Sequence, residues 1–262
     1  MTPLRVLDLF SGIGGFSLGL ERTGGFKTVA FCEIEPFPRR VLAKPWPEVP
    51  CYDDVRTLTA DRLRADGIAV DVICGGFPCQ DISTAGKHVG IGGERSGLWS
   101  EIVRLSGELR PNFIIVENVS ALLSCGMGRV LGDLASLGYD AEWDCITADA
   151  VGAPHSRDRV WIVAHSRRFA GAFSFPTRRD AAEARRRNAK IWRQNRHFPQ
   201  VAPVLAQVSA QGMDQPNFDR VVDGVSDWAH RLKGCGNSVV PQIPEMIGHA
   251  ILASLAEQEV SA

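Results

Sequence analysis

One cysteine stands in a loop whose sequence restricts its position. The stretch Gly75-Gly76-Phe77-Pro78-Cys79 follows the apolar run 70–74, which predicts a short buried strand. We expect the two glycines to turn the chain sharply there, and Pro78 restricts the backbone around it. Ligands of open α/β sheets bind at the carboxyl ends of strands, so a thiol held there is a candidate nucleophile. The alternative is a small buried apolar residue, as many cysteines are.

Charged side chains near two other predicted strands could act with that thiol. The strand 112–116 is followed by Glu117, whose burial would raise its pKa and suit it to share or donate a proton. Alternation in an extended segment places His155, Arg157 and Arg159 on one face. Two guanidinium groups and an imidazole together favour an anion or the polar edge of a base. Taken singly, such arginines are usually solvated surface residues.

The N-terminal residues predict a site for an adenosine-containing ligand. The strand 4–10 leads into the glycine turn, residues 11–16, and then into a helix at 17–21. This is the opening of a nucleotide-binding Rossmann unit. The spacing is not Gly-x-Gly-x-x-Gly, because Ser17 stands at the third glycine position. A pyrophosphate cofactor is therefore less favoured than an adenosine ligand without phosphates.

Acidic residues follow the next two predicted strand ends. Glu33 comes directly after the strand 28–32, where a carboxylate usually binds a ribose diol. Asp53 and Asp54 form a second acidic cluster, and an aspartate there can accept a hydrogen bond from an adenine amino group. The alternative for Glu33 is an exposed acidic loop residue.

Length and composition predict a globular protein. The chain has 262 residues, 45% hydrophobic and 23% charged, which fits one large α/β domain with room for a small second lobe. It has no apolar run of eighteen residues and no signal-peptide pattern, so we expect a cytoplasmic protein. The seven cysteines are odd in number and include no Cys-x-x-Cys pair. We therefore expect reduced thiols and no metal site.

Basic charge is concentrated in one segment. Residues 167–196 hold ten Lys and Arg residues and two acidic ones, whereas the whole chain has a net charge of −1. An acidic body with one basic segment fits a phosphate-binding arm, and the alternative is a solvated helix face. The glycine-rich stretch 86–97 predicts a mobile lid. Further helices are expected at 100–109 and 126–137, and further strands at 141–146 and 159–164.

These residues together resemble the DNA (cytosine-5) methyltransferase family. The matching motifs, in the family's order, are DLFSGIGGFSLGL (8–20), CEIEPF (32–37), DDV (53–55), GGFPCQDIS (75–83), RSGLW (95–99), ENV (117–119), HSRDRVWIV (155–163) and GNSVVPQ (236–242). The resemblance implies a Rossmann-like S-adenosylmethionine-dependent α/β fold with a mixed, mostly parallel sheet. It also implies a catalytic domain at 1–166 and 231–262 and a short basic target-recognition region at 167–230.

The resemblance further implies a cofactor pocket and a reaction. The implied S-adenosylmethionine pocket consists of Phe10, Gly12, Ile13, Gly14, Glu33, Ile34, Asp54, Val55, Pro78 and Leu98, closed by Asn237 and Ser238. A cytosine in a specific duplex DNA sequence would be rotated out of the stack and methylated at carbon 5. Cys79 would add to carbon 6, while Glu117 contacts ring nitrogen 3 and the exocyclic amine. Arg159 would bind the carbonyl oxygen, and Arg157 would organise the region of Cys79.

Partners follow from the same resemblance. We expect double-stranded DNA as substrate, no membrane association, a monomer, and a cognate restriction endonuclease as a candidate partner. The stretch RLKGCGNSVVPQ resembles compact phage and prophage forms of the family, which implies a prokaryotic or phage-encoded protein. Three features depart from the family. His155 replaces the usual Gln, the arginine-rich ninth motif is not evident, and 167–229 is short for target recognition.

Four other functions stay open. An RNA cytosine-5 methyltransferase of the same fold would share Cys79 and Glu117. A catalytically silent DNA-binding relative would have lost one of these two residues. A nicotinamide dehydrogenase would need Gly-x-Gly-x-x-Gly, which is absent from the glycine turn. A non-catalytic basic adaptor would not need the pocket motifs.

Overall fold

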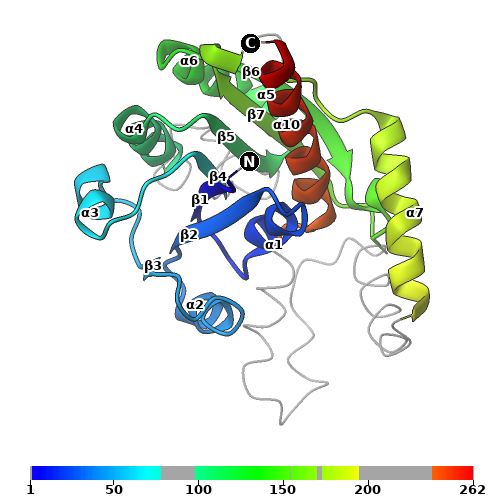
Figure 1. Cartoon of the computed structure of the whole chain (residues 1–262), viewed down its shortest axis with the longest axis horizontal. Helices are drawn as coiled ribbons and strands as arrows, with labels where there is room; N and C mark the ends of the chain where they lie inside the picture. The colour runs from blue at the N-terminus through cyan, green and yellow to red at the C-terminus, as the bar shows by residue number, and fades with distance from the viewer. Residues whose placement is uncertain (1, 78–97, 154, 170–172, 195–237, 262) are drawn as a thin grey trace.

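A single sheet runs through the part of the chain that the structure describes. The computed structural model describes residues 2–77, 98–153, 155–169, 173–194 and 238–261. Within them, seven strands are ordered β3-β2-β1-β4-β5-β7-β6 (Figure 1). These strands are β1 (Leu4–Leu9), β2 (Phe26–Cys32), β3 (Cys51–Tyr52), β4 (Val72–Gly76), β5 (Phe113–Val119), β6 (Tyr139–Thr147) and β7 (Asp158–Ser166). The predicted lid at 86–97 lies outside the described residues.

The pairing of the strands makes the sheet mixed and mostly parallel. β1 to β4 pair only in parallel, as does β5 with β4, whereas β7 lies antiparallel to both β5 and β6. The predicted fold class is therefore confirmed. In this order the carboxyl ends of β2, β1, β4 and β5 lie side by side, which is the edge where α/β sheets bind ligands.

Helices cover both faces of the sheet. They are α1 (Gly15–Arg22), α2 (Pro36–Leu42), α3 (Ala60–Ala65), α4 (Trp99–Leu109), α5 (Leu122–Cys125), α6 (Met127–Ser136), α7 (Arg178–Gln194) and α10 (Gln242–Ser261), with 3-10 turns η3 (Ala148–Val151) and η4 (Arg167–Phe169). Along β5, Ile114 and Val116 pack with α4 and α6, whereas Phe113 and Ile115 pack with α1 and α10. Period-two alternation thus divides the core into two layers. Figure 1 shows α1 and α10 side by side on the second layer.

Two glycines behave differently from the prediction. Gly75 and Gly76 do not turn the chain after the strand but form the last two residues of β4. Instead, both positions require glycine because there is no room for a side chain. A Cβ on Gly75 would lie 2.4 Å from the Leu9 carbonyl oxygen, and one on Gly76 would lie 2.8 Å from the Glu117 carboxylate. The other strands and helices that were predicted lie within a few residues of their expected positions, and α1 begins at Gly15 rather than at residue 17.

The C-terminal segment packs on the first helix. A Cβ on Gly15 would lie 2.5 Å from the Val239 carbonyl oxygen, and one on Gly19 would lie 2.1 Å from that of Pro241. Both glycines therefore allow the two backbones to approach closely. Ile247 and Ile251 of α10 are fully buried in the same layer. As predicted from the sequence, residues more than two hundred positions apart thus meet beside the glycine turn.

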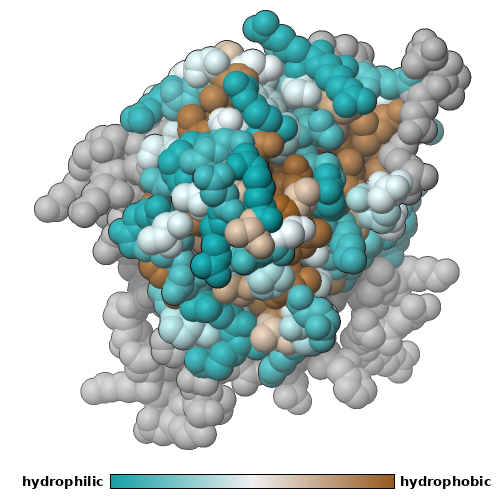
Figure 2. Space-filling model, turned by 60° about the vertical axis from the view of Figure 1, so that its left-hand side comes forward, coloured by the Kyte–Doolittle hydropathy of each residue, from teal (hydrophilic) through white to brown (hydrophobic). Residues whose placement is uncertain are grey.

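The helix α7 carries exposed arginines. Arg179, Arg186 and Arg187 are exposed, whereas Ala184 on the same helix is buried against the core. The described part of the basic segment therefore has one packed face and one charged face. Figure 2 turns the β3 side of the molecule forward and shows hydrophilic side chains over most of that surface, with smaller hydrophobic patches between them. Among the helices that the structure describes, none combines the length and apolar composition of a membrane span.

Candidate active site at the carboxyl edge of the sheet

Glu117 lies beside the strand that leads to Cys79. β4 and β5 are parallel neighbours, and their register pairs Gly76 with Glu117. The next residue after β4 is held as well, because Asn118 Nδ2 donates to the Phe77 carbonyl oxygen at 3.1 Å. The predicted neighbourhood of these two strands is therefore confirmed up to Phe77. Cys79 lies outside the described residues.

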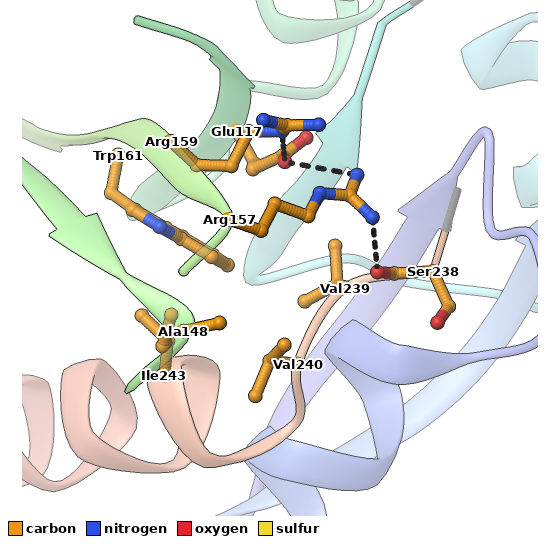
Figure 3. Close-up of a pocket in the computed structure, with 9 residues that line it drawn as sticks. All are labelled: Glu117, Ala148, Arg157, Arg159, Trp161, Ser238, Val239, Val240 and Ile243. Atoms are coloured by element: carbon orange, nitrogen blue, oxygen red, sulfur yellow. Dashed lines mark hydrogen bonds and ion pairs between the residues drawn. The ribbon is translucent and has the colours of Figure 1, made fainter. Parts of the chain in front are cut away.

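Two arginines from β7 and the segment before it hold the Glu117 carboxylate. Arg159 Nε lies 2.9 Å from Glu117 Oε1, and Arg157 Nη2 lies 3.7 Å from the same oxygen (Figure 3). We call these three residues the Glu117 cluster. Glu117 is 8% exposed. Burial raises the pKa of Glu117 above its usual range, although the charges of Arg157 and Arg159 act to lower it.

A small recess opens next to this cluster. It is lined by the Glu117 cluster and by Trp161, Ser238 and Val239, among others (Figure 3). Trp161 lies directly opposite Glu117 in the β5–β7 register. Its buried indole nitrogen has no hydrogen-bond partner among the described residues. The sequence analysis did not single out Trp161, although the alternation that groups Arg157 with Arg159 continues to it.

Arg157 also ties the cluster to the C-terminal segment. Its Nη1 donates to the Ser238 carbonyl oxygen at 3.0 Å (Figure 3). Ser238, predicted from the sequence to close the cofactor pocket, is thus placed on the Glu117 side of the site. Asn237 lies outside the described residues. One guanidinium therefore links the catalytic candidate on β5 to the segment that packs on α1.

His155 belongs to the same charged group. It is half-buried, and burial lowers its pKa below the usual value for histidine. The charges of Arg157 and Arg159 lower this pKa further, while Asp149 raises it. Each of these charges is close enough to act on the imidazole, so the three side chains lie near one another, and their shared face stays a prediction.

The glycine turn is shaped by backbone conformations that few residues adopt. Phe10, Gly12 and Gly14 have φ values of 54°, 52° and 85°, in the left-handed region. For Phe10 this is uncommon, since a non-glycine residue there is strained. Ser11 stabilises the turn by donating from Oγ to the Asp8 carbonyl oxygen at 2.6 Å.

Glu33 contacts this turn directly. Its Oε2 accepts from the Gly12 backbone N–H at 2.8 Å, and its Oε1 accepts from the Glu35 N–H at 2.8 Å. Glu33 is buried, so the alternative of an exposed acidic loop residue is wrong. Each carboxylate oxygen still has a further lone pair with which to accept a hydrogen bond.

The other predicted pocket residues differ in their surroundings. Ile34 is 61% exposed, although it is a large apolar side chain. Val55 is buried, and Ile13 and Leu98 are partly buried. Asp54 forms an ion pair with Arg56, at 2.8 Å, and hydrogen bonds from Arg56 lower the pKa of Asp54. Pro78 lies outside the described residues.

A buried carboxyl group lies beneath the glycine turn. Asp8 of β1 is fully buried, and its Oδ2 accepts from Ser17 Oγ of α1 at 2.7 Å. Its other oxygen has no hydrogen-bond partner in the described part of the chain. Burial raises the pKa of Asp8 to about 7. The sequence analysis gave Asp8 no role, although a charged residue inside the apolar run LRVLDLF was a signal.

The features around the turn fit a nucleoside bearing a flat apolar ring and a diol. A Cβ on Gly12 would have no atom of the described residues within 4 Å, so among these residues the space beside it is open. Glu33 lies next to it with acceptor oxygens, and the exposed Ile34 offers an apolar surface one residue away. The described donor and acceptor set therefore suits the adenosine part of S-adenosylmethionine.

Comparison with known proteins agrees with this geometry. The C-5 cytosine-specific DNA methylase family model matches residues 4–202, more than half of the chain. The chain belongs to this family. As a member of the methylase family, it is 37% identical over 169 residues to the Type II methyltransferase M2.BsuMI of Bacillus subtilis, which covers 62% of the chain and 42% of that relative. It is 35% identical over 182 residues to M.HgiBI of Herpetosiphon aurantiacus, which covers 67% of the chain and 40% of that relative.

Solved structures resemble this methylase-family chain over a similar extent. A protein from an E. coli prophage, described as a DNA modification methyltransferase, has a TM-score of 0.54 at 28% identity, covering 63% of this chain and 47% of its own. The S. pombe Dnmt2 methyltransferase has a TM-score of 0.52 at 23% identity, covering 63% of this chain and 50% of its own, and supports the fold alone. The chain spans less than half the length of the two curated relatives.

Proposed function

We propose that this chain transfers a methyl group from S-adenosylmethionine to carbon 5 of cytosine in a specific duplex DNA sequence. The observation that carries the proposal is the Glu117 cluster, a buried carboxyl group opposite the glycine that leads into the Cys79 loop. Family membership supports the same reaction. The alternative is an RNA substrate, and the assay described below distinguishes it from duplex DNA.

The cofactor would bind along the glycine turn. Glu33 would accept from the ribose hydroxyls, and Ile34 would pack on the adenine, with Val55 and Leu98 nearby. S-adenosylmethionine supplies an electrophilic methyl group on a sulfonium. The chain's own contribution is to orient this group toward the Glu117 side of the site. Asp54 would have to give up part of its ion pair with Arg56 to bind the adenine amino group.

The chemistry would begin with the Cys79 thiolate adding to carbon 6 of an extruded cytosine. This bond would move the electron pair of the carbon 5–carbon 6 double bond toward carbon 5. Carbon 5 would then take the methyl group, with the methyl carbon–sulfur bond breaking and the neutral thioether S-adenosylhomocysteine leaving. Glu117, whose pKa burial raises, would donate a proton to ring nitrogen 3 in its protonated form and stabilise the charge that builds there. Loss of the carbon 5 proton to solvent would then expel the Cys79 thiolate and restore the carbon 5–carbon 6 double bond. Return of the nitrogen 3 proton to Glu117 would complete the cycle.

Arg159 has two tasks in this proposal. In the absence of substrate it pairs with Glu117 at 2.9 Å. When cytosine enters, Arg159 would donate to the ring carbonyl oxygen, which requires its guanidinium to share or leave the carboxylate. Weakening that ion pair would raise the pKa of Glu117 and favour the protonated form that nitrogen 3 requires. Arg157 would keep its hydrogen bond to Ser238 and hold the region in place.

The basic helix α7 would contact phosphates of the duplex. Arg179, Arg186 and Arg187 are exposed and sit on a helix anchored to the core, as a positioning contact requires. We assign α7 to the proposed target-recognition region 167–230. A monomer working in the cytoplasm, with a cognate restriction endonuclease as a candidate partner, completes the proposal.

The experiment that tests the function is methyl transfer from labelled S-adenosylmethionine to duplex DNA and to transfer RNA. Wild-type protein should label only the DNA, and Cys79→Ser should abolish labelling while cofactor binding is retained. Cys125→Ser, at an exposed thiol on α5, is the matched control and should leave the rate unchanged. DNA carrying 5-fluorocytosine in the target should trap a covalent adduct. Labelling of RNA alone, or full activity of Cys79→Ser, would reject the proposal.

A further inference from the structure

The loop after α2 places an aromatic side chain against the glycine turn. A Cβ on Gly14 would lie 2.7 Å from Cζ3 and 2.9 Å from Cη2 of Trp46. The six-membered ring of Trp46 therefore lies directly on the Gly14 backbone, where φ is 85°. Only a residue without a Cβ fits beneath this ring. The sequence around Trp46 predicts a connecting loop and gives this side chain no role.

Two further contacts, with Glu21 and Phe31, hold Trp46 in this position. Its Nε1 donates to Glu21 Oε2 at 2.9 Å, and the other Glu21 oxygen accepts from the Thr28 N–H at 2.9 Å. Its rings pack edge to face on Phe31, with centroids 5.2 Å apart. The indole is thus fixed to α1 and β2 together. A ring held in this way can fix the backbone position of the residue on which it packs, here Gly14, rather than only fill space in the core.

The segment 33–46 contacts the glycine turn from both of its ends, and Leu42 Cδ2 also lies against Gly14. Glu33, at its start, accepts from the Gly12 N–H, and Trp46, at its end, packs on Gly14. Between them the turn has little freedom to change its left-handed conformations. Binding geometry at such a site depends on the residues that support it as well as on those that touch the ligand.

We propose that Trp46 is a positioning residue for cofactor binding, which acts through Gly14 to hold the glycine turn in its binding conformation. This inference rests on the proposed S-adenosylmethionine site. Simple core packing is the competing explanation. It predicts a loss of fold stability with no change in cofactor affinity once the protein is folded.

Isothermal titration of the full chain with S-adenosylmethionine tests this inference. Trp46→Phe keeps a ring and removes the donor to the Glu21 carboxylate, so its Kd should rise about fivefold, less than the full value of a charge-assisted hydrogen bond because this bond supports the site indirectly. Trp46→Ala should raise it more than about tenfold, because no ring then packs on Gly14. Trp143→Ala is the matched control, since Trp143 is 46% exposed on the edge strand β6 and should leave the Kd unchanged.

A double-mutant cycle separates positioning from general packing. Gly14→Ala should weaken binding strongly in the wild-type background, because the new Cβ meets the Trp46 ring. In the Trp46→Ala background the same change should weaken it less, since the ring is gone and of the three nearest atoms only Leu42 Cδ2, at 2.9 Å, still opposes the new Cβ. An equal penalty in both backgrounds, or a wild-type Kd in Trp46→Ala, would overturn the inference. Should Trp46→Ala fail to fold, Trp46→Leu serves the same comparison, because it also removes the ring while keeping more of the apolar volume.

Hydrogen exchange gives a readout that does not need the cofactor. Amides of the glycine turn should exchange several times faster in Trp46→Phe than in the wild type, while those of β5 stay unchanged. A wild-type protein that binds no S-adenosylmethionine would reject the proposed cofactor, yet faster exchange confined to the turn would still uphold the role of Trp46. Unchanged exchange would reject that role.

Discussion

The site consists of two regions that reach the same edge of the sheet by different means. Around Glu117, position depends on charged side chains, because Arg157 and Arg159 both hold one buried carboxylate. Around the glycine turn, position depends on the backbone, with left-handed residues, close approaches and a ring packed on Gly14. Substitutions that keep shape and change charge should therefore affect the first region, and those that add atoms should affect the second.

The largest expected effect is on the charged region. Glu117→Gln keeps the shape of the side chain and removes the acid, so kcat should fall by roughly 10²–10³-fold. The Kd for S-adenosylmethionine should stay within a factor of about two. Single-turnover methyl transfer and calorimetry measure the two quantities. Asp140→Asn, at an exposed carboxylate on β6, is the control. A large change in Kd would mean that the two regions are not separable.

A second prediction asks whether charge also matters beneath the glycine turn. The pKa of Asp8 is raised from 3.8 to about 7 in the folded protein. Between these values the folded state binds more protons than the unfolded state, so the free energy of unfolding falls as pH rises. Asp8 alone should remove about 2 to 3 kcal/mol between roughly pH 5 and pH 8.

Asp8→Asn tests this prediction because it cannot ionise. Denaturant unfolding across this pH range gives the free energy of unfolding of both proteins. This free energy should fall with rising pH in the wild type and should fall less in the variant. The exposed Asp140→Asn variant again provides the control, here for nonspecific pH effects. Parallel curves for wild type and Asp8→Asn would show that Asp8 does not carry the expected linkage.

Two glycine substitutions sharpen the contrast within the backbone region. Gly15→Ala places a Cβ 2.5 Å from the Val239 carbonyl oxygen, and backbone atoms yield little. It should destabilise the fold by about 1–3 kcal/mol. Gly12→Ala meets nothing within 4 Å and should cost about 1 kcal/mol, from its left-handed conformation alone. Urea unfolding measures both, and a larger cost at Gly12 would reverse the interpretation.

The smallest effect lies outside both regions. Gln substitution of Arg186 and Arg187 should weaken duplex binding a few-fold, and the slope of log Kd against log salt should fall by about one for each phosphate that is no longer neutralised. Fluorescence anisotropy at several salt concentrations measures this slope. Lys27→Gln, at an exposed residue near the start of β2, is the control. An unchanged slope would make α7 a solvated helix face.

Residue types and their spacing predicted much of this site. Glu33, Glu117 and Arg159 each follow or begin a short apolar run, and a strand end at the binding edge is where such polar residues are expected. The mixed, mostly parallel pairing of the sheet followed from the family resemblance. The predicted roles of the site residues, Cys79 above all, stay predictions.

The features that the sequence missed depend on contacts between distant segments. Gly76 is a glycine because the Glu117 carboxylate lies over it, which only the register between β4 and β5 reveals. Trp46 has an ordinary loop sequence, and its ring meets Gly14 through tertiary packing alone. Trp161 could have been predicted from the sequence, because it continues the alternation of Arg157 and Arg159.

The two-residue period of β7 limits which insertions and deletions this strand can accept without disturbing the site. β7 pairs Arg159 with Val119 and Trp161 with Glu117, so the two side chains share a face only while the count between them stays even. A single-residue insertion within β7 would send one of them to the opposite layer. We therefore expect changes in chain length to occur in the loops that connect the strands. Between Arg159 and Trp161, only insertions of an even number of residues would keep both side chains on one face.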